Sequence, residues 1–165
     1  MMRENGTDQA QDILTLRGRL SEIAELAPWI ESLALRHTIP PDVQFAIALC
    51  LEEVISNAIC HGYGGEKEDR SVVVRFIAPR DQYIVFLVED EAPPFNPLDA
   101  PELPPLNPHE EMRIGGQGLR LLRRFAGTLE YEQMPGGNRL RLGFSTAGSS
   151  ETASATTDST DHQVT

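Results

Sequence analysis

The sequence of 165 residues has the length of a single domain, and its 40% hydrophobic and 24% charged content is typical of a soluble globular protein with its own core. A formal net charge of −11 argues against nucleic acid or an anionic membrane as a partner, because both are bound chiefly through basic patches. No segment resembles a signal peptide or a membrane span.

The two cysteines, Cys50 and Cys60, lie ten residues apart on one predicted helix, about 15 Å by its rise. That separation is too long for a disulfide, so the two thiols cannot pair if the helix forms. We expect both thiols to be packed in the core of a cytoplasmic protein.

The chain begins with a polar segment, residues 1–10, which we expect to be flexible. Residues 13–20 alternate well enough to predict a first strand, although Gly18 weakens it. A helical pattern then opens at Ser21, but Pro28 would kink a helix that is already under way. The first helix therefore starts either at Ser21 or near Pro28.

A second helix is predicted to begin at Pro41, because proline suits the first turn of a helix and Asp42 complements its dipole. Within it, Glu53, Asn57 and His61 recur at intervals of four and so fall on one face. The residues around them are almost all apolar, which predicts a buried helix. Polar side chains on a buried helix need a partner or a ligand.

Two of these polar side chains suit a catalytic site. A carboxylate such as Glu53 can accept a proton from a nucleophile, and the carboxamide of Asn57, one turn later, can offer its oxygen to Mg²⁺. The alternative is that the polar stripe is the solvated edge of an amphipathic helix.

Two β-hairpins are predicted after this helix, because runs rich in Val, Ile, Phe and Leu are separated by turn residues. The turns fall at 79–82 and 135–137. The second strand of the first hairpin ends at Asp90. The four strands are predicted at 71–78, 83–89, 128–133 and 138–144.

Residues 91–114 hold seven of the twelve prolines and show no hydrophobic period, so they form a lid, a binding loop or a disordered segment, and the flanking motifs favour a lid. A glycine-rich turn, residues 115–118, then leads into an apolar helix. Such a turn suits phosphate, because backbone N–H groups and the helix dipole point at the anion; the alternative is a flexible linker. Residues 146–165 include ten Ser or Thr and no aromatic, which predicts a disordered tail.

Three signals occur in order: a polar stripe on a buried helix, Asp90 at a strand end before the proline-rich segment, and a glycine turn that leads into a helix. This order resembles the GHKL-type (Bergerat) ATP-binding fold shared by gyrase, bacterial histidine kinases, mismatch-repair ATPases and heat-shock chaperones. The sequence is most similar to the small anti-sigma-factor serine/threonine kinases. The most specific piece is 53–63, Glu-Val-Ile-Ser-Asn-Ala-Ile-Cys-His-Gly-Tyr. The resemblance implies an α/β two-layer sandwich over residues 11–145, with a mixed, mostly antiparallel sheet covered on one face by helices that include 41–63 and 116–126.

The resemblance also assigns roles to single residues. Asn57 would hold the Mg²⁺ that bridges the triphosphate of ATP, Glu53 would be the general base, and His61 belongs to the same motif. Asp90 would accept the adenine amino group, two residues before Ala92, which stands where the family usually has glycine. The alanine methyl is a small obstacle to adenine if φ is negative and a larger one if φ is positive. The phosphates would be wrapped by Gly115, Gly116, Gly118 and Leu119.

The function implied by the resemblance is an anti-sigma-type kinase. It would bind ATP and Mg²⁺, phosphorylate a serine of a small antagonist (anti-anti-sigma, STAS-type) protein, and otherwise hold a sigma factor or similar target. A homodimer is expected through the first strand and first helix. The second hypothesis is a binding module, an ATP-dependent partner switch without significant kinase activity. The third, a fragment of an ATPase or histidine kinase, agrees less well, since neither a phosphoacceptor helix pair nor a transducer domain is expected beside this domain.

Overall fold

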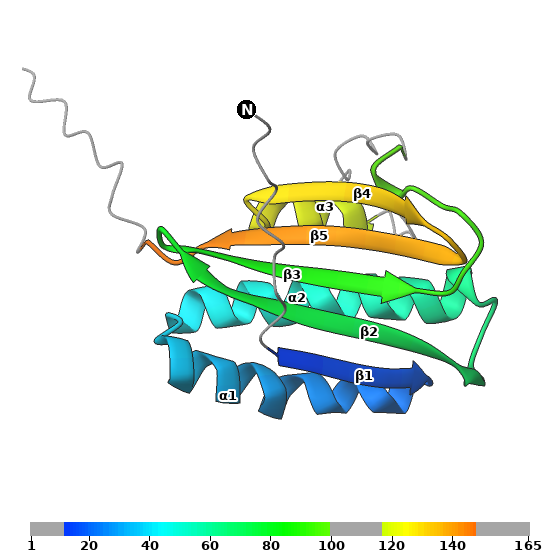
Figure 1. The fold of residues 1–165 in the computed structure, drawn as a ribbon, viewed down its shortest axis with the longest axis horizontal. Helices are drawn as coiled ribbons and strands as arrows, with labels where there is room; N and C mark the ends of the chain where they lie inside the picture. Colours follow the sequence, from blue (N-terminus) through cyan, green and yellow to red (C-terminus); the bar gives the residue numbers. More distant parts are fainter. Residues whose placement is uncertain (1–11, 100–116, 148–165) are drawn as a thin grey trace, which may run out of the picture.

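The computed structural model describes residues 12–99 and 117–147, and in it a five-stranded sheet forms one layer and helices form the other (Figure 1). The strands lie in the order β1-β2-β3-β5-β4, and every neighbouring pair is antiparallel. The predicted two-layer α/β sandwich is confirmed, but the sheet is antiparallel rather than mixed. The strands are β1 (Asp12–Gly18), β2 (Lys67–Arg80), β3 (Tyr83–Asp90), β4 (Thr128–Met134) and β5 (Gly137–Ser145).

The first helical region changes its backbone geometry along its length. A 3₁₀-helix, η1 (Leu20–Glu25), leads into the α-helix α1 (Leu26–His37). Pro28 therefore falls in the first turn of α1, where its missing N–H breaks no intrahelical hydrogen bond. Of the two predicted starts, the one near Pro28 is confirmed.

The central helix is shorter than the sequence predicts. The α-helix α2 (Pro41–Asn57) ends at Asn57, and a π-helix, η2 (Ala58–Gly62), continues it. The α-helical spacing that predicts His61 in line with Glu53 and Asn57 therefore does not extend to His61. The helical region ends at Gly62. It is followed by Gly64 and Gly65, whose φ angles of 71° and 121° are conformations that glycine adopts without strain.

The two hairpins agree with the prediction except at their ends. The β2–β3 turn is only two residues long, Asp81 and Gln82, and both have positive φ, as in the type I′ turns that match the twist of a hairpin. The β4–β5 turn has Gly136 at a φ of 81°. Two short helices complete the described chain: the 3₁₀-helix η3 (Pro97–Asp99) and the α-helix α3 (Gln117–Phe125).

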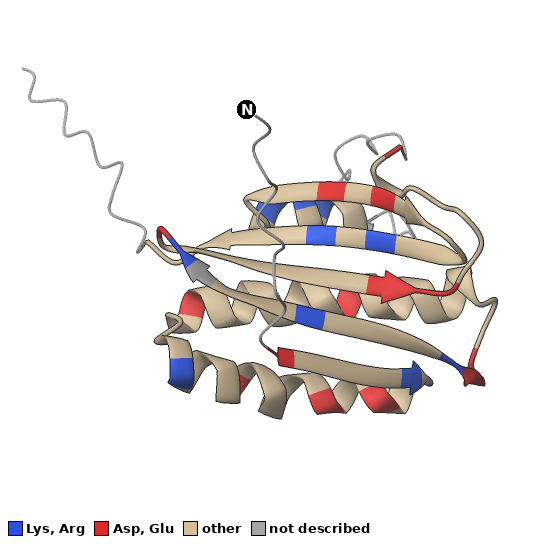
Figure 2. Ribbon diagram, in the orientation of Figure 1, with Lys and Arg blue, Asp and Glu red and all other residues tan. Residues whose placement is uncertain are grey.

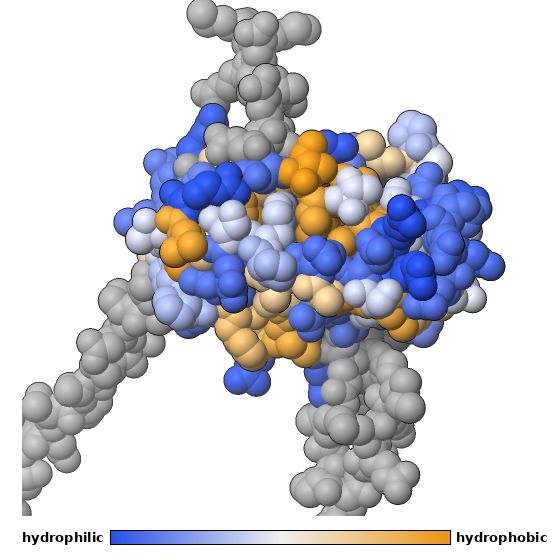
Figure 3. All heavy atoms as spheres, turned by 90° about the horizontal axis from the view of Figure 1, so that it is seen from below, coloured by the Kyte–Doolittle hydropathy of each residue, from blue (hydrophilic) through white to orange (hydrophobic). Residues whose placement is uncertain are grey.

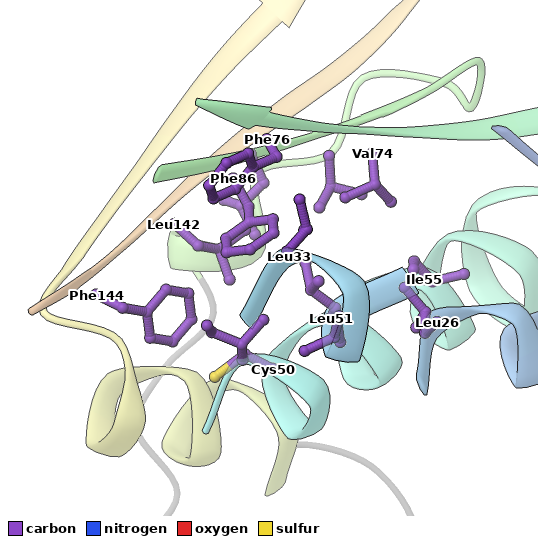
Figure 4. Close-up of a cluster of buried hydrophobic side chains, with 14 of the residues drawn as sticks. Leu26, Leu33, Cys50, Leu51, Ile55, Val74, Phe76, Phe86, Leu142 and Phe144 are labelled. Atoms are coloured by element: carbon purple, nitrogen blue, oxygen red, sulfur yellow. The ribbon is translucent and has the colours of Figure 1, made fainter. Parts of the chain in front are cut away.

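The core lies between the sheet and the helices (Figure 4). Its aromatic centre is Phe86, whose ring lies 5.4 Å from Phe76, 6.0 Å from Trp29 and 6.1 Å from Phe144 between centroids. Helix α2 contributes five buried residues. They are Ala46, Ile47, Cys50, Leu51 and Ile55.

The central helix is buried on one side and not all round, which corrects two expectations. Cys50 is buried, and its burial raises the pKa of its thiol to about 12, whereas Cys60 is exposed. Phe45, on the same helix, is 61% exposed. The segment Pro41–Gly62 is long and apolar enough to cross a membrane by length and composition, but in this fold its buried residues pack into the core.

Among the described residues no helix covers the other face of the sheet (Figure 1), and charged residues occur on neighbouring strands (Figure 2). Acidic and basic side chains alternate from strand to strand. Arg75 of β2 and Arg139 of β5 both form ion pairs with Glu89 of β3, and Arg139 also forms one with Glu132 of β4. We call these four residues the open-face ion cluster. Seen from the edge formed by α1 and β1, the surface is mostly hydrophilic, with separate apolar areas (Figure 3).

Candidate functional site

The carboxyl end of α2 presents two predicted site residues side by side. The Asn57 Nδ2 donates a hydrogen bond of 3.0 Å to Oε1 of Glu53, one turn earlier. Asn57 is exposed and Glu53 is half-buried, so both can be reached from solvent. Since the amide nitrogen of Asn57 is turned toward Glu53, its oxygen keeps its lone pairs for another partner.

The first turn of α3 rests against the same carboxylate. A Cβ atom at Gly118 would lie 1.9 Å from Oε1 of Glu53, so a side chain there could not be accommodated without moving Glu53. Gly118 is buried and Leu119, which follows it, is half-buried. The structure thus brings Glu53, Asn57 and Gly118 together from segments about sixty residues apart, whereas Gly115 and Gly116 lie outside the described residues.

Asp90 ends β3 on the face that the helices cover. Its Oδ1 accepts hydrogen bonds from the Ala92 N–H and from Nδ2 of Asn138, both at 2.9 Å. No residue in the described part of the chain donates a hydrogen bond to Oδ2. Half-buried Asp90 therefore keeps one oxygen available as an acceptor, which is what recognition of an amino group requires.

Ala92 allows adenine to approach the backbone, a point that the sequence left undecided. Its φ is not among the positive values found in the described residues, so its methyl group is the smaller of the two predicted obstacles. Ala92 is buried against Gly62 of η2, where an added Cβ would lie 2.9 Å from the Ala92 Cβ. The missing side chain at Gly62 makes room for the extra methyl at Ala92.

Tyr63 ties the end of the helical region to the sheet. Its hydroxyl donates a 2.5 Å hydrogen bond to the Ser71 carbonyl and accepts one of 3.0 Å from the Glu91 N–H. Burial raises the pKa of the Tyr63 hydroxyl, so it keeps its proton and this donated hydrogen bond at neutral pH. Through Tyr63 and Gly62, the helix end and the segment after Asp90 are held at a fixed distance.

The structure leaves one predicted residue apart and adds one that the sequence analysis missed. His61 is exposed within η2, and it takes part in no hydrogen bond or ion pair with the described residues. Asn138, by contrast, is 6% exposed and is the single buried polar residue among those described. A sequence signal for it existed, because Asn138 precedes Leu140, Leu142 and Phe144 at the two-residue spacing of an inward-facing strand.

The residues present fit a nucleotide with Mg²⁺ better than a metal bound by protein alone. No group of three or more His, Cys, Asp or Glu side chains in the described residues could hold a metal ion. Mg²⁺ usually keeps water and substrate phosphates as ligands and takes one or two from the protein. The free oxygen of Asn57 suits that requirement, and the first turn of α3 lies against the neighbouring Glu53.

Comparison with known proteins decides the family. The model of the histidine kinase-like ATPase domain matches residues 16–144. The chain belongs to this family. Membership of an ATPase domain family implies that the protein binds ATP.

A serine/threonine-protein kinase, BtrW of Bordetella bronchiseptica, is 26% identical to this histidine kinase-like domain over 132 residues, which are 79% of this chain and 91% of BtrW. The similarity agrees with the resemblance to anti-sigma-type kinases that the sequence motifs indicate.

Two solved structures show the same fold. The RsbU and RsbW domains of Rv1364c from Mycobacterium tuberculosis align with 81% of this chain at a TM-score of 0.58 and 15% identity. The histidine kinase domain of a blue-light activated kinase from Erythrobacter litoralis aligns with 77% at a TM-score of 0.50 and 18% identity. This chain spans 31% and 60% of those two chains, respectively.

Proposed function

We propose that the protein is an anti-sigma-factor-type serine/threonine kinase. It binds ATP with Mg²⁺, phosphorylates a serine of a small antagonist protein of the anti-anti-sigma, STAS type, and sequesters a sigma factor or similar target. The observation that supports the proposal is that one carboxylate, Glu53, accepts a hydrogen bond from Asn57 and also lies against Gly118 in the first turn of α3. The similarity to BtrW supports kinase activity rather than ATP hydrolysis alone.

In this proposal Glu53, Asn57 and His61 have separate tasks. Glu53 accepts the proton of the serine hydroxyl as the new O–P bond forms and the bond to the leaving ADP oxygen breaks. The oxygen of Asn57 is a ligand of Mg²⁺, which neutralises charge on the phosphates when bound. His61 belongs to the same motif and lines the nucleotide.

The remaining residues bind the adenine ring and the phosphates of ATP. Asp90, beside Ala92, accepts a hydrogen bond from the amino group of adenine. The glycine turn and Leu119 bind the phosphates through backbone N–H groups. Residues 91–114 act as the ATP lid of a domain that spans 11–145, and the Ser/Thr-rich tail, 146–165, takes no part in catalysis. The phosphate-binding residues are Gly115, Gly116, Gly118 and Leu119.

A homodimer is part of the proposal, and the surface of the first strand and first helix supports it. β1 is an edge strand of the sheet, and Ile13 on it is 52% exposed. Leu35 on α1 is 86% exposed. Exposed apolar side chains next to an unpaired strand edge favour association with a second copy.

The decisive experiment compares Glu53→Gln with Glu52→Gln. Glu52 is an exposed neighbour that a helical step of about 100° turns away from Asn57. Phosphate transfer from labelled ATP to the cognate antagonist should fall about 10²–10⁴-fold in Glu53→Gln, while ATP binding persists, and Glu52→Gln should match the wild type.

Complex formation, followed by size-exclusion chromatography, separates the two hypotheses of function. A wild-type protein that binds the antagonist tightly but transfers no phosphate would establish the binding module instead. Loss of transfer in Glu52→Gln rather than Glu53→Gln would refute the assignment of the base.

A further inference from the structure

Asn138 lies at the start of β5, directly opposite Asp90 in the β3–β5 register. It occupies a position on the helix-covered face where the next inward residues are apolar, and its side chain is buried. A buried carboxamide is costly unless its donors and acceptor are all used, so a buried asparagine at a strand end requires an explanation.

All the polar atoms of the Asn138 side chain are engaged. Its Nδ2 donates to Oδ1 of Asp90 at 2.9 Å and to the carbonyl oxygens of Pro93 and Ala92 at 3.1 and 3.2 Å. Its Oδ1 accepts the Phe95 N–H at 3.0 Å and the Tyr131 hydroxyl at 2.6 Å. One side chain thus joins β4 and β3 to the segment that follows Asp90.

This set of bonds fixes the carboxylate of Asp90. Two donors, Asn138 Nδ2 and the Ala92 N–H, hold Oδ1, so the carboxylate cannot rotate without breaking these part-buried hydrogen bonds. Oδ2 is then the oxygen directed to a ligand. An ionised carboxylate is an acceptor only, so it attracts an amino group and repels a carbonyl oxygen at the same position.

We propose that Asn138 is a positioning residue that makes the site selective for a 6-aminopurine over a 6-oxopurine, by holding Asp90 in one orientation and anchoring residues 92–95 beside it. The inference rests on the proposed role of Asp90 in adenine recognition and adds the residue that sets it. Without the amide donors of Asn138, only the Ala92 N–H holds Oδ1, so the carboxylate of Asp90 is less firmly oriented and the selectivity falls.

The test measures the affinity of the full chain for ATP and for inosine triphosphate, which carries a carbonyl in place of the amino group, by calorimetric titration. We expect the wild type to prefer ATP by about 10- to 100-fold, the value of a hydrogen bond to a charged group. In Asn138→Ser the ratio should fall about tenfold, mainly through weaker ATP binding.

Further variants separate positioning from loss of structure. Leu142→Val weakens the core without touching Asp90, and Tyr131→Phe removes a bond to Asn138 while leaving the bond to Asp90; both should keep the wild-type ratio. In an Asp90→Ala background, Asn138→Ser should no longer change the ratio. If Asn138→Ser proves too unstable, Asn138→Thr, which fills more of the space, gives the same comparison.

Each outcome decides between two explanations. A folded Asn138 variant with an unchanged ratio would overturn the positioning role while leaving ATP binding intact. A wild type that binds ATP and inosine triphosphate equally would overturn it as well. Binding of neither nucleotide by the wild type would overturn both this inference and the proposed function.

Discussion

The open-face ion cluster and the candidate site both contain half-buried carboxylates, Glu89 in the first and Glu53 and Asp90 in the second, yet these carboxylates use their hydrogen-bonding capacity differently. Glu89 receives Arg75 on Oε2 at 2.9 Å and Arg139 on Oε1 at 2.6 Å, so both of its oxygens are engaged. Glu53 and Asp90 each use one carboxylate oxygen among the described residues. A saturated carboxylate supports the sheet, whereas one with an unused oxygen can receive a ligand.

The electrostatics of the open-face ion cluster follow from this saturation. Burial alone would raise the pKa of Glu89, but hydrogen bonds from Arg75 and Arg139 outweigh it and hold the pKa below its ordinary value. Burial would likewise lower the pKa of Arg139, and its bonds to Glu89 and Glu132 raise it instead. The charges therefore stay paired at neutral pH.

The largest expected effect on the metal dependence of nucleotide binding comes from removing the unused oxygen of Asn57. In Asn57→Ala the gain in ATP affinity that Mg²⁺ provides should drop by roughly tenfold or more, since even outer-shell partners of a metal change affinity by 10–100-fold. Stability should hardly change, because Asn57 is exposed. Titrations with and without Mg²⁺ measure the effect. Ser56→Ala is the control, because among the described residues the Ser56 hydroxyl donates a hydrogen bond to the backbone carbonyl of Glu53 and to no other group. Equal Mg²⁺ dependence in Asn57→Ala and wild type would remove Asn57 from the metal site.

The contact between Gly62 and Ala92 joins the helical segment that carries Glu53 and Asn57 to the segment that follows Asp90. Changing this contact should have an intermediate effect on stability. Gly62→Ala places two methyl carbons 2.9 Å apart, and such overpacking costs about 1–3 kcal/mol. Urea unfolding measures the loss. Ala92→Gly in the same chain should restore most of it, so the two changes should be coupled. If the stability change of the double variant equals the sum of those of Gly62→Ala and Ala92→Gly, the backbone moves to relieve this contact.

The smallest effect is expected from the open-face ion cluster. Glu89→Gln should lower stability by about 1 kcal/mol at pH 7, because a charge-assisted bond is lost and two arginines remain close together. The pKa of Glu89 is lowered in the folded state, so the stability it contributes is present above the ordinary Glu pKa of about 4.3 and is lost as pH falls through the folded-state pKa.

The difference in stability between wild type and Glu89→Gln should therefore be largest near neutral pH and shrink below about pH 4. Unfolding by urea at a series of pH values measures it, and nucleotide affinity should stay unchanged. A difference that grows on acidification would reverse the assigned direction of the pKa. A change in ATP affinity would show that the saturated cluster also serves the site.

Much of the fold follows from local patterns in the sequence. Apolar runs separated by turn residues predict the four strands of the hairpins, and Pro28 and Pro41 mark where helices begin, because these signals depend on neighbours within one turn or one strand. The pairing of Glu53 with Asn57 is also local, since residues four apart on a helix lie side by side. The sequence by itself therefore determined the elements and the first half of the site.

Contacts between distant segments were decided only by the tertiary structure. Gly118 meets Glu53, Gly62 meets Ala92, and Asn138 meets Asp90 across separations that no periodicity records. The π-helical end of the central helix, which replaces the expected α-helical turn at His61, has no pattern of its own in the sequence. A hydrophobic period tells which side of an element faces inward, but the partner that it meets there depends on how the whole sheet and its helices pack.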